Sequence, residues 1–383
     1  MVGLRRALHA DGWFDDMRIA VPSMKNELDL VALGTVADVV KLDQNNRLLV
    51  HHGLDVIKQR QSKIGLSALL AIGRRDQSQI LASDLSYCVG PRLNAAGRLS
   101  NMTIGVQCLI TDNPIEADNI ADKLNELNME RRQIEIDMQE KASEILGEIA
   151  FNGDTARGIC LFDPSWHQGV IGILASRVKE QYHRPTIIFT RDTEGVLKGS
   201  ARSLAKLNIR DALCDIATTH PGIILKFGGH AMAAGLSIVE DKFEAFVQAF
   251  DNIIADKLSM DDLNSTIFTD GNLDKSYINL DFARMLRQYG PWGQGFPEPI
   301  FEGEFEIIDQ RIVGNNHLKL ILEIDDFNSV SAIMFNVDTN VWPDQNCTRI
   351  KATYKLDVNE YRGRHQVQLI LEHIAASHVL AEA

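Results

Sequence analysis

The sequence predicts a multidomain α/β protein that ends in an antiparallel β-barrel. Helix-like and strand-like segments alternate from residue 157 onward, and period-two apolar patterns follow one another beyond residue 298. Long helical patterns precede both regions. With 383 residues, of which 45% are hydrophobic and 24% charged, the chain can form two or three packed domains.

The N-terminal segments are expected to be mainly helical. Residues 4–16 have the pattern of an amphipathic helix, and 17–21 that of a short strand. The apolar run at 28–40 predicts a buried strand that leads through a loop into a helix. The polar residues 43–46 are expected to cap a further helix over 47–60.

A long polar helix is predicted to start at Asn113-Pro114, because apolar residues recur after it near helical spacing. Its length suggests that it links or spans domains. An α/β unit follows. Its segments predict, in order, strand, helix, strand and helix: 157–162, 170–182, 186–189 and 207–217.

Five C-terminal segments alternate apolar and polar residues as strands do, with a hairpin turn at Arg362-Gly363-Arg364 between the last two. Such a set predicts a small antiparallel barrel, of which the oligonucleotide-binding type is one example. The five segments are 301–308, 317–324, 330–337, 349–361 and 365–374.

The composition excludes several classes of protein. No apolar run approaches the roughly 18 residues of a membrane span, so none is expected. Five cysteines lie at least 20 residues apart, which fits neither a CxxC metal pair nor an even disulfide set. A reducing, cytoplasmic environment is therefore expected. Taken alone, the net charge of −13 argues against nucleic-acid binding.

The charge is, however, strongly segregated along the chain. Residues 111–150 hold 11 acidic and 4 basic residues, 240–263 hold 7 and 2, and 298–310 hold 5 and none. The other 306 residues carry a net charge of +4. Acidic runs are usually solvated faces. The segment 195–210 has four basic residues and no acidic one, so it calls for a functional explanation.

Asp38 is the most suggestive carboxylate, because it lies within an otherwise apolar run in which an unpaired charge is costly. It either caps a helix or binds a cation. The neighbouring pair His51-His52 is a poor metal site, since adjacent side chains on a helix do not face the same way.

Two motifs could bring the chain close to phosphate. Residues 90–98 combine glycine and alanine with Arg92 and Arg98, which fits either phosphate contacts or a turn with surface arginines. Residues 166–172 lie between a predicted strand and the helix that carries Arg177. The N-terminus of that helix could bind an anion, although a core tryptophan and a structural histidine explain the motif equally well.

Two further motifs lie downstream. Residues 199–203 place Ser200 and Arg202 in the most basic window of the chain, which favours a phosphate clamp over a structural role. Residues 227–235 surround His230 with glycine and alanine, so that backbone and imidazole could meet a ligand together. Tight packing of a Gly/Ala helix is the alternative. No Gly-Lys-Ser/Thr follows, so this is not a Walker loop.

Together the motifs resemble the RecJ family, single-strand-specific DNA exonucleases of the DHH phosphoesterase superfamily. They occur in the family's order, and the resemblance covers residues 4–375. The matching segments are ALGTVADVV (32–40), GPRLNAAGRL (90–99), WHQGVIGILASR (166–177), GSARS (199–203), FGGHAMAAG (227–235) and PWGQGFPEPIF (291–301).

The resemblance implies a metal-dependent hydrolase that removes nucleotides from the 5′ end of single-stranded DNA in repair and recombination. It implies a two-cation site of Mn or Mg, in which Asp38 matches the last metal-binding aspartate. By resemblance, the terminal phosphate is contacted by Arg98, Ser200 and Arg202. The strand or the scissile phosphate is contacted by Arg92, Arg177 and His230, of which His230 is also a catalytic candidate, and the backbone of Gly228 and Gly229 is expected to approach the ligand. The candidates for strand contacts on the barrel are Tyr354, Tyr361, Arg362 and Arg364.

The resemblance also implies a domain order. We expect a remnant of the DHH α/β catalytic domain at 1–60, a helical linker at 61–150, a DHH-associated domain at 151–255 and an oligonucleotide-binding (OB) barrel at 256–383. The expected partners are single-stranded DNA and, by family, a single-strand-binding protein and a helicase. The protein is expected to be a monomer and not to bind membranes.

One departure from the family pattern concerns the metal ligands. The family's Asp-x-Asp loop, a further Asp and the Asp-His-His triplet lie N-terminal to the matching stretch, and His51-His52 follows Asp38 instead of preceding it. We therefore expect a truncated or split product of a RecJ-type gene, inactive alone. The alternatives are a non-catalytic single-strand-binding module, or a DHH phosphodiesterase for short oligonucleotides or cyclic dinucleotides.

Overall fold

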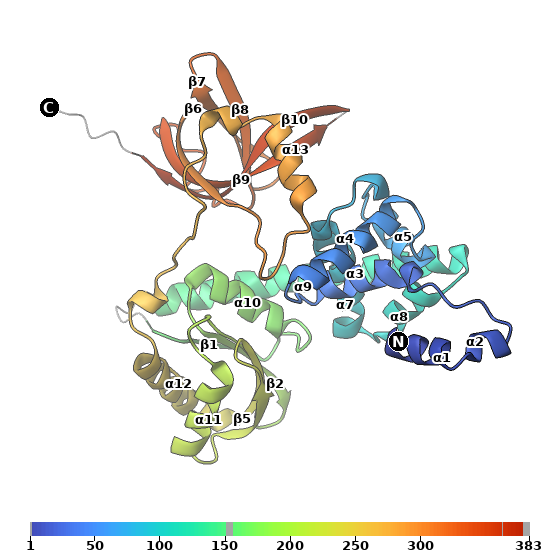
Figure 1. Cartoon of the computed structure of the whole chain (residues 1–383). Helices are drawn as coiled ribbons and strands as arrows, with labels where there is room; N and C mark the ends of the chain where they lie inside the picture. Colours follow the sequence, from blue (N-terminus) through green and yellow to red (C-terminus); the bar gives the residue numbers. More distant parts are fainter. Residues whose placement is uncertain (1, 151–155, 362, 378–383) are drawn as a thin grey trace. The chain divides into compact units, whose positions relative to one another are not determined.

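The molecule divides into two compact units. The computed structural model describes residues 2–150, 156–361 and 363–377. The first unit contains Met1–Gly90 and Ile267–Ala383, and the second contains Pro91–Thr266 (Figure 1). No helix in these described residues is both long enough and apolar enough to cross a membrane.

The N-terminal part of the first unit is helical. Asp43 caps α4 as predicted, because its carboxylate accepts a hydrogen bond from the Asn46 backbone N–H at 2.8 Å. A π-helical turn at Leu85–Val89 ends this part. Its α-helices are α1 (Val2–Ala10), α2 (Trp13–Asp16), α3 (Leu28–Ala37), α4 (Gln44–Lys58), α5 (Ile64–Ile72) and α6 (Ala82–Asp84).

Two predictions for this part were wrong. The apolar run at 28–40 forms helix α3 instead of a strand, and 17–21 contain no strand. A short run that is apolar on all sides suits a helix packed among helices as well as a buried strand. The fully buried Asp29 carboxylate in α3 accepts a hydrogen bond from the Lys63 N–H at 2.7 Å, so it fixes α3 to the start of α5.

The C-terminal part of the first unit is a closed five-stranded barrel, as predicted. Its strands lie in the order β10-β8-β7-β6-β9, and β7 buries every second residue in the interior. The pairing of β8 with β10 is parallel and the others are antiparallel. The strands are β6 (Phe301–Val313), β7 (His317–Asp325), β8 (Asn328–Met334), β9 (Arg349–Tyr361) and β10 (Arg364–Ala376).

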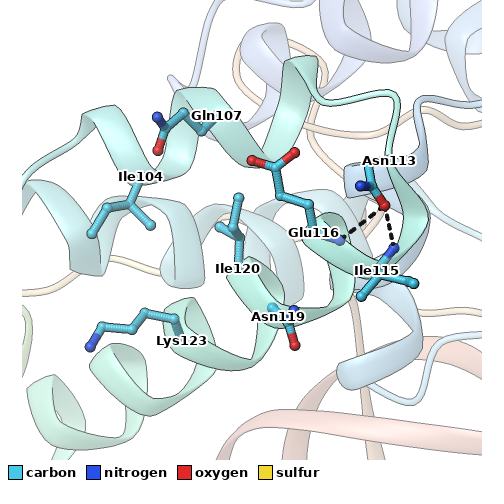
Figure 2. A pocket seen from close by; sticks show the side chains of 8 residues that line it. All are labelled: Ile104, Gln107, Asn113, Ile115, Glu116, Asn119, Ile120 and Lys123. Atoms are coloured by element: carbon cyan, nitrogen blue, oxygen red, sulfur yellow. Dashed lines mark hydrogen bonds between the residues drawn. The ribbon is translucent and has the colours of Figure 1, made fainter.

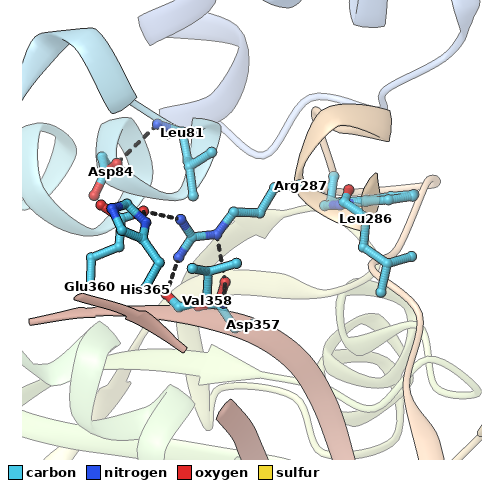
Figure 3. Close-up of polar contacts among 9 residues, drawn as sticks. Leu81, Asp84, Leu286, Arg287, Asp357, Val358, Glu360 and His365 are labelled. Atoms are coloured by element: carbon cyan, nitrogen blue, oxygen red, sulfur yellow. Dashed lines mark hydrogen bonds and ion pairs between the residues drawn. The ribbon is translucent and has the colours of Figure 1, made fainter. Parts of the chain in front are cut away.

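Helix α13 (Leu280–Tyr289) is anchored to the barrel by one arginine (Figure 3). Arg287 Nε lies 2.7 Å from Asp357 Oδ1, and its Nη1 lies 2.8 Å from Glu360 Oε1. Its remaining nitrogen donates to the Val358 carbonyl. The planar guanidinium thus uses its donors in several directions at once.

The loop after α13 joins the barrel to the helical part of the first unit. Trp292 stacks on Phe296 with ring centroids 4.9 Å apart. The Arg47 guanidinium of α4 lies 3.5 Å from the centre of the Phe296 ring, a cation–π contact. The Leu42 N–H donates to the Gln294 carbonyl at 2.6 Å.

The second unit combines helices with a mixed five-stranded sheet. Strand order is β1-β2-β3-β5-β4, with β1 and β2 parallel and the other pairs antiparallel. Its elements are α7 (Gly90–Leu99, which starts at the boundary), α8 (Thr103–Ile110), α9 (Pro114–Ala150), β1 (Ile159–Phe162), α10 (Ile171–Tyr182), β2 (Thr186–Thr193), β3 (Val196–Arg202), α11 (Ile209–Thr219), β4 (Ile224–Gly229), β5 (Ala233–Val239) and α12 (Phe243–Lys257).

Both faces of this sheet are covered. Phe189 points into an apolar cluster with Leu213 of α11 and Phe246 of α12. The next residue in β2, Ile188, lies in a cluster with Leu174 of α10 and Met138 of α9. This alternation along β2 explains its continuous apolar run. The four predicted elements are present, but β3, which was not predicted, lies between the second strand and the second helix.

The start of α9 confirms the predicted helix at Asn113-Pro114. The Asn113 side-chain oxygen accepts hydrogen bonds from the Ile115 and Glu116 N–H groups at 3.0 and 3.4 Å (Figure 2). A groove of about 520 Å³ lies here between α8 and α9. Three apolar and five polar side chains line it: Ile104, Gln107, Asn113, Ile115, Glu116, Asn119, Ile120 and Lys123.

Two motifs adopt structures other than the predicted alternatives. Residues 90–99 form helix α7 instead of a turn, since Pro91 is tolerated in a first helical turn and the alanines favour a helix. Residues 227–235 belong to the hairpin of β4 and β5 instead of a Gly/Ala helix.

Candidate anion and strand-binding site

Strand β3 presents Ser200 and Arg202 on the same face, because they are two residues apart. Arg202 Nη1 donates to Ser200 Oγ at 3.1 Å. The first turn of α10 approaches this pair closely. A Cβ atom on Gly172 would lie 2.9 Å from Arg202 Nη2 and 3.0 Å from Ser200 Oγ, so a larger residue there would displace the ends of these two side chains.

Arg98, at the C-terminal end of α7, contacts the loop that precedes α10. Its Nη1 donates to the Gly169 carbonyl at 3.1 Å. A Cβ atom on Gly169 would lie 2.3 Å from the Arg98 carbonyl oxygen, so the loop before α10 also needs glycine. His167 Nδ1 accepts a hydrogen bond from the Gly169 N–H at 3.1 Å. The structure therefore brings Arg98, Ser200 and Arg202 together around one loop.

The two arginines are half-buried cations without acidic partners. Burial lowers the pKa of Arg202, and repulsion by Arg98 lowers it further. Burial likewise lowers the pKa of Arg98, with further repulsion from Arg131 and a smaller opposing attraction from Glu135. In the part of the chain that the structure describes, neither Arg98 nor Arg202 forms an ion pair with a carboxylate. Such a pair of guanidinium groups can bind an anion bidentately.

A polar network on α9 supports these arginines, and the sequence analysis missed it. Glu135 is only 8% exposed and accepts from Arg131 Nη1 at 2.6 Å and from Arg177 Nε at 3.1 Å. Arg131, 9% exposed, also donates to Asn128 Oδ1 at 3.3 Å. Among the described residues, Arg131 Nε has no partner. We call Arg98, Arg131, Glu135, Arg177, Ser200 and Arg202 the arginine cluster.

The spacing of these residues could have revealed the network. Asn128, Arg131 and Glu135 lie three and four residues apart, so they share one helix face. Leu124 and Met138 belong to the buried side of the same helix. Polar residues that continue a buried stripe are candidates for a buried site. The acidic run containing Glu135 is therefore not only a solvated face.

The turn that carries His230 lies at the same end of the sheet as Arg202. Arg202 pairs with Ala233 across β3 and β5, and the His230 N–H donates to the Ala233 carbonyl at 2.8 Å. Gly229 has φ of +150°, and a Cβ there would lie 2.4 Å from the Ala233 oxygen. A Cβ on Gly228 would meet nothing within 4 Å. The His230 side chain is exposed.

Arg92 and Asp38 lie elsewhere. Arg92, on α7, donates to Asn125 Oδ1 of α9 at 3.0 Å. Asp38 belongs to the first unit and is exposed. It follows α3 at its C-terminal cap, where its N–H donates to the Gly34 carbonyl at 3.1 Å, so it is not the helix N-cap that the sequence allowed.

The described residues do not fit a metal centre. No three His, Cys, Asp or Glu side chains among them come together in a way that could hold an ion. A two-cation site needs several carboxylates or histidines within a few ångströms. Asp38 alone does not meet that requirement.

The predicted strand contacts on the barrel need one correction. Tyr354 is completely buried and packs against Phe301 and Phe305 at 6.1 and 5.6 Å between ring centres. Burial raises its pKa to about 12. It cannot stack on a base. Arg364 is exposed at the start of β10, the Tyr361 backbone ends β9, and Arg362 lies outside the described residues.

Comparison with known proteins agrees with this architecture. Residues 155–256 match the DHHA1 domain family, and 269–373 match the RecJ OB domain family. Over 98% of its length, the chain is 48% identical to a protein from Dickeya dadantii and 46% identical to one from Escherichia coli, each named single-stranded-DNA-specific exonuclease RecJ.

The chain belongs to the RecJ family. It spans 65% of the length of these two RecJ relatives. A crystal structure of RecJ from Thermus thermophilus in complex with Mg2+ superposes with a TM-score of 0.76 at 26% identity, covering 96% of this chain and 54% of that one. The RecJ resemblance and the fold class predicted from the motifs are confirmed.

Proposed function

We propose that this chain holds the 5′ end of single-stranded DNA within a RecJ-type 5′-to-3′ exonuclease of DNA repair and recombination. The arginine cluster carries this proposal. A terminal phosphate bears nearly two negative charges at neutral pH and offers three acceptor oxygens, as phosphate monoesters do. Arg98 and Arg202, which form no ion pair with a carboxylate among the described residues, provide the matching charge-assisted donors.

Each predicted residue has a place in this proposal. Ser200 and the two arginines would contact the terminal phosphate, aided by the N-terminus of α10 beside Gly172. Five further predicted residues would contact the following phosphates or the scissile one. Those residues are Arg92, Arg177, Gly228, Gly229 and His230.

The cleavage chemistry is assigned to the family rather than derived from these residues. Two Thermus thermophilus RecJ structures are complexes with Mg2+ and Mn2+. Asp38 is the proposed ligand for such a divalent ion in this chain, but the described residues do not assemble a site around it. A single-strand-binding role without cleavage is therefore the second candidate. A single-strand-binding protein and a helicase are proposed as partners by family.

The proposal is tested by comparing two strands that differ only at the 5′ end. Fluorescence anisotropy should show that the full chain binds the 5′-phosphorylated strand more tightly than the 5′-hydroxyl strand, by about tenfold for one lost charge-assisted contact. Arg202→Gln should remove this difference. Adding Mn2+ and analysing the length of the strand afterwards shows whether the bound strand is also cleaved.

Arg191→Gln is the matched control. Arg191 lies on the neighbouring strand β2 but is exposed and paired with Glu240. Its substitution should leave the preference for a 5′ phosphate intact. Full retention of the preference in Arg202→Gln would place phosphate recognition elsewhere and overturn the assignment.

A further inference from the structure

The loop at residues 163–170, which we call the α10 loop, lies where α/β units bind ligands. β1 and β2 are parallel neighbours, and α10 lies between them in the chain. The loop therefore leaves the carboxyl end of a parallel strand and leads into the N-terminus of a crossover helix, a place suited to anions. Its Gly169 carbonyl is the group that accepts the hydrogen bond from Arg98.

The α10 loop begins with a buried carboxylate. Asp163 is 9% exposed and directly follows β1. Its Oδ1 accepts hydrogen bonds from the Ser165 N–H at 2.8 Å and from the Ser165 hydroxyl. Its Oδ2 lies 2.5 Å from Nζ of Lys141 on α9. A buried carboxylate requires such partners, because an unpaired buried charge is costly.

These contacts keep Asp163 ionised. Burial raises the pKa of its carboxyl group, but hydrogen bonds from Lys141 and Ser165 outweigh burial and hold that pKa below its ordinary value. Asp163 is therefore charged at neutral pH, and its attraction to the ammonium group of Lys141 acts under the conditions in which DNA binding is measured.

A second buried side chain holds the middle of the α10 loop. Thr190 of β2 is 2% exposed, and its hydroxyl donates to the Trp166 carbonyl at 2.6 Å. The Trp166 side chain is buried in the apolar cluster that contains Ala142 of α9 and Leu174 of α10. The loop is thus tied to α9 at its start and to β2 at its middle.

Arg98 depends on a fixed loop, because its other surroundings repel it. The charge of Arg131 lowers the pKa of Arg98, and the charge of Arg98 lowers that of Arg202. Cations this close together separate unless other groups hold them. The Gly169 carbonyl at 3.1 Å is such a group, so its position helps to set that of the guanidinium.

We propose that Lys141 and Asp163 are positioning residues for the arginine cluster. Their ion pair fixes the start of the α10 loop, so that the Gly169 carbonyl holds Arg98 where a terminal phosphate binds. The inference rests on the proposed function, since it assumes that Arg98 contacts this phosphate. Lys141 and Asp163 act through the loop and have no contact with DNA of their own.

The test compares two labelled strands that differ only in a 5′ phosphate or a 5′ hydroxyl, bound by the full chain. Lys141→Met removes the ion pair but keeps a long apolar side chain. Anisotropy should show that its preference for the phosphorylated strand falls about fivefold, while its affinity for the hydroxyl strand stays within about twofold of the wild type. Lys141→Arg keeps the charge and a hydrogen-bond donor, so it should keep the preference.

A double-mutant cycle tests whether the two residues act as a pair. Asp163→Asn should reduce the preference about as much as Lys141→Met, and the double variant should lose no more than either single variant. Lys141 is 45% exposed, so its replacement should leave the protein folded. Urea denaturation of each variant checks this.

Lys257→Met is the matched control. Lys257 of α12 lies 2.7 Å from Asp215 of α11, which is also a lysine–aspartate pair of the second unit. Those two helices cover the face of the sheet opposite to α9 and α10. The preference for a 5′ phosphate should therefore be unchanged in this variant.

The outcomes separate the two levels of inference. If the wild type does not distinguish the two strands, the proposed function fails and the positioning role fails with it. If the wild type distinguishes them but Lys141→Met does so to within about twofold of the same degree, or loses affinity for both strands equally, the positioning role alone is refuted. Additive losses in the double variant would also refute it, because they would show that Lys141 and Asp163 act separately.

Discussion

The arginine cluster and the surface of the barrel both carry basic side chains, but the two are built in different ways. In the cluster, Arg131 and Glu135 are almost completely buried and Arg98 is tied to a loop carbonyl. On the barrel, Lys351 of β9 is exposed and lies 3.8 Å from Glu302. A preorganised buried cluster suits recognition of one phosphate at a fixed point. An exposed ion pair contributes little to stability.

The largest expected effect concerns the buried carboxylate of the cluster. Glu135→Gln removes the charge that pairs with Arg131 and Arg177, leaving Arg131 buried without a counter-ion. Breaking a buried ion pair in this way should lower the free energy of unfolding by about 3 kcal/mol. Urea denaturation of wild type and variant measures this loss of unfolding free energy.

Glu180→Gln is the control for this change, because Glu180 is exposed and 3.9 Å from Arg177. Its substitution should change the unfolding free energy by less than about 0.5 kcal/mol. Equal effects of the two variants would show that Glu135 is no more important than a surface acid.

An intermediate effect is expected where α10 meets β3. Gly172→Ala places a methyl group within 3.0 Å of Arg202 and Ser200, so the side chains of this pair must move. The preference for a 5′-phosphorylated strand should fall about tenfold, corresponding to about 1.4 kcal/mol. Alanine favours the helix itself, so α10 should not be weakened.

Gly147→Ala in α9 is the corresponding control, since a methyl group there meets nothing within 4 Å. Titrations of both variants with phosphorylated and unphosphorylated strands measure the difference. An unchanged preference in Gly172→Ala would mean that Arg202 tolerates displacement and that the cluster is less rigid than its contacts indicate.

The smallest effect is expected for Tyr354→Phe. The hydroxyl has no hydrogen-bond partner among the described residues, so its removal should change stability at neutral pH by less than about 1 kcal/mol. Strand binding should be unchanged.

The pH dependence of stability provides a second test of the burial of the Tyr354 phenol. Its pKa is raised to about 12 by burial in the folded protein, against about 10 for an unfolded tyrosine. The folded state therefore favours the protonated phenol, and this contribution to stability is lost as pH rises from about 10 to 12. Wild type should lose more stability than Tyr354→Phe between pH 9 and 11. Parallel losses would show that the phenol is solvated.

The sequence predicted the barrel well because β7 and β9 alternate apolar and polar residues over most of their length. The same alternation also assigns Tyr354 to the interior with Ile350, Ala352, Leu356 and Val358, so the stacking role given to it by resemblance conflicted with a local pattern. Arg98, Ser200 and Arg202 were predicted individually. Their convergence depends on Gly169 and Gly172, whose need for close approach appears only in three dimensions.

Other features could not be derived from local patterns. The run at 28–40 is apolar around its whole circumference, so periodicity could not distinguish helix from strand. The buried Glu135 lies within an acidic run that resembles a solvated helix face. Its burial depends on Arg177, 42 residues further along the chain. Long-range pairing of this kind has no local sequence pattern.

Closure of the barrel also limits how other proteins can bind it. Every strand from β6 to β10 has a neighbour on both sides, so the barrel offers no free edge to which a partner could add a strand. The sheet of the second unit differs, because β1 and β4 are edge strands. Recruitment by strand addition would have to use that sheet, whereas the barrel can be recognised only through its side chains.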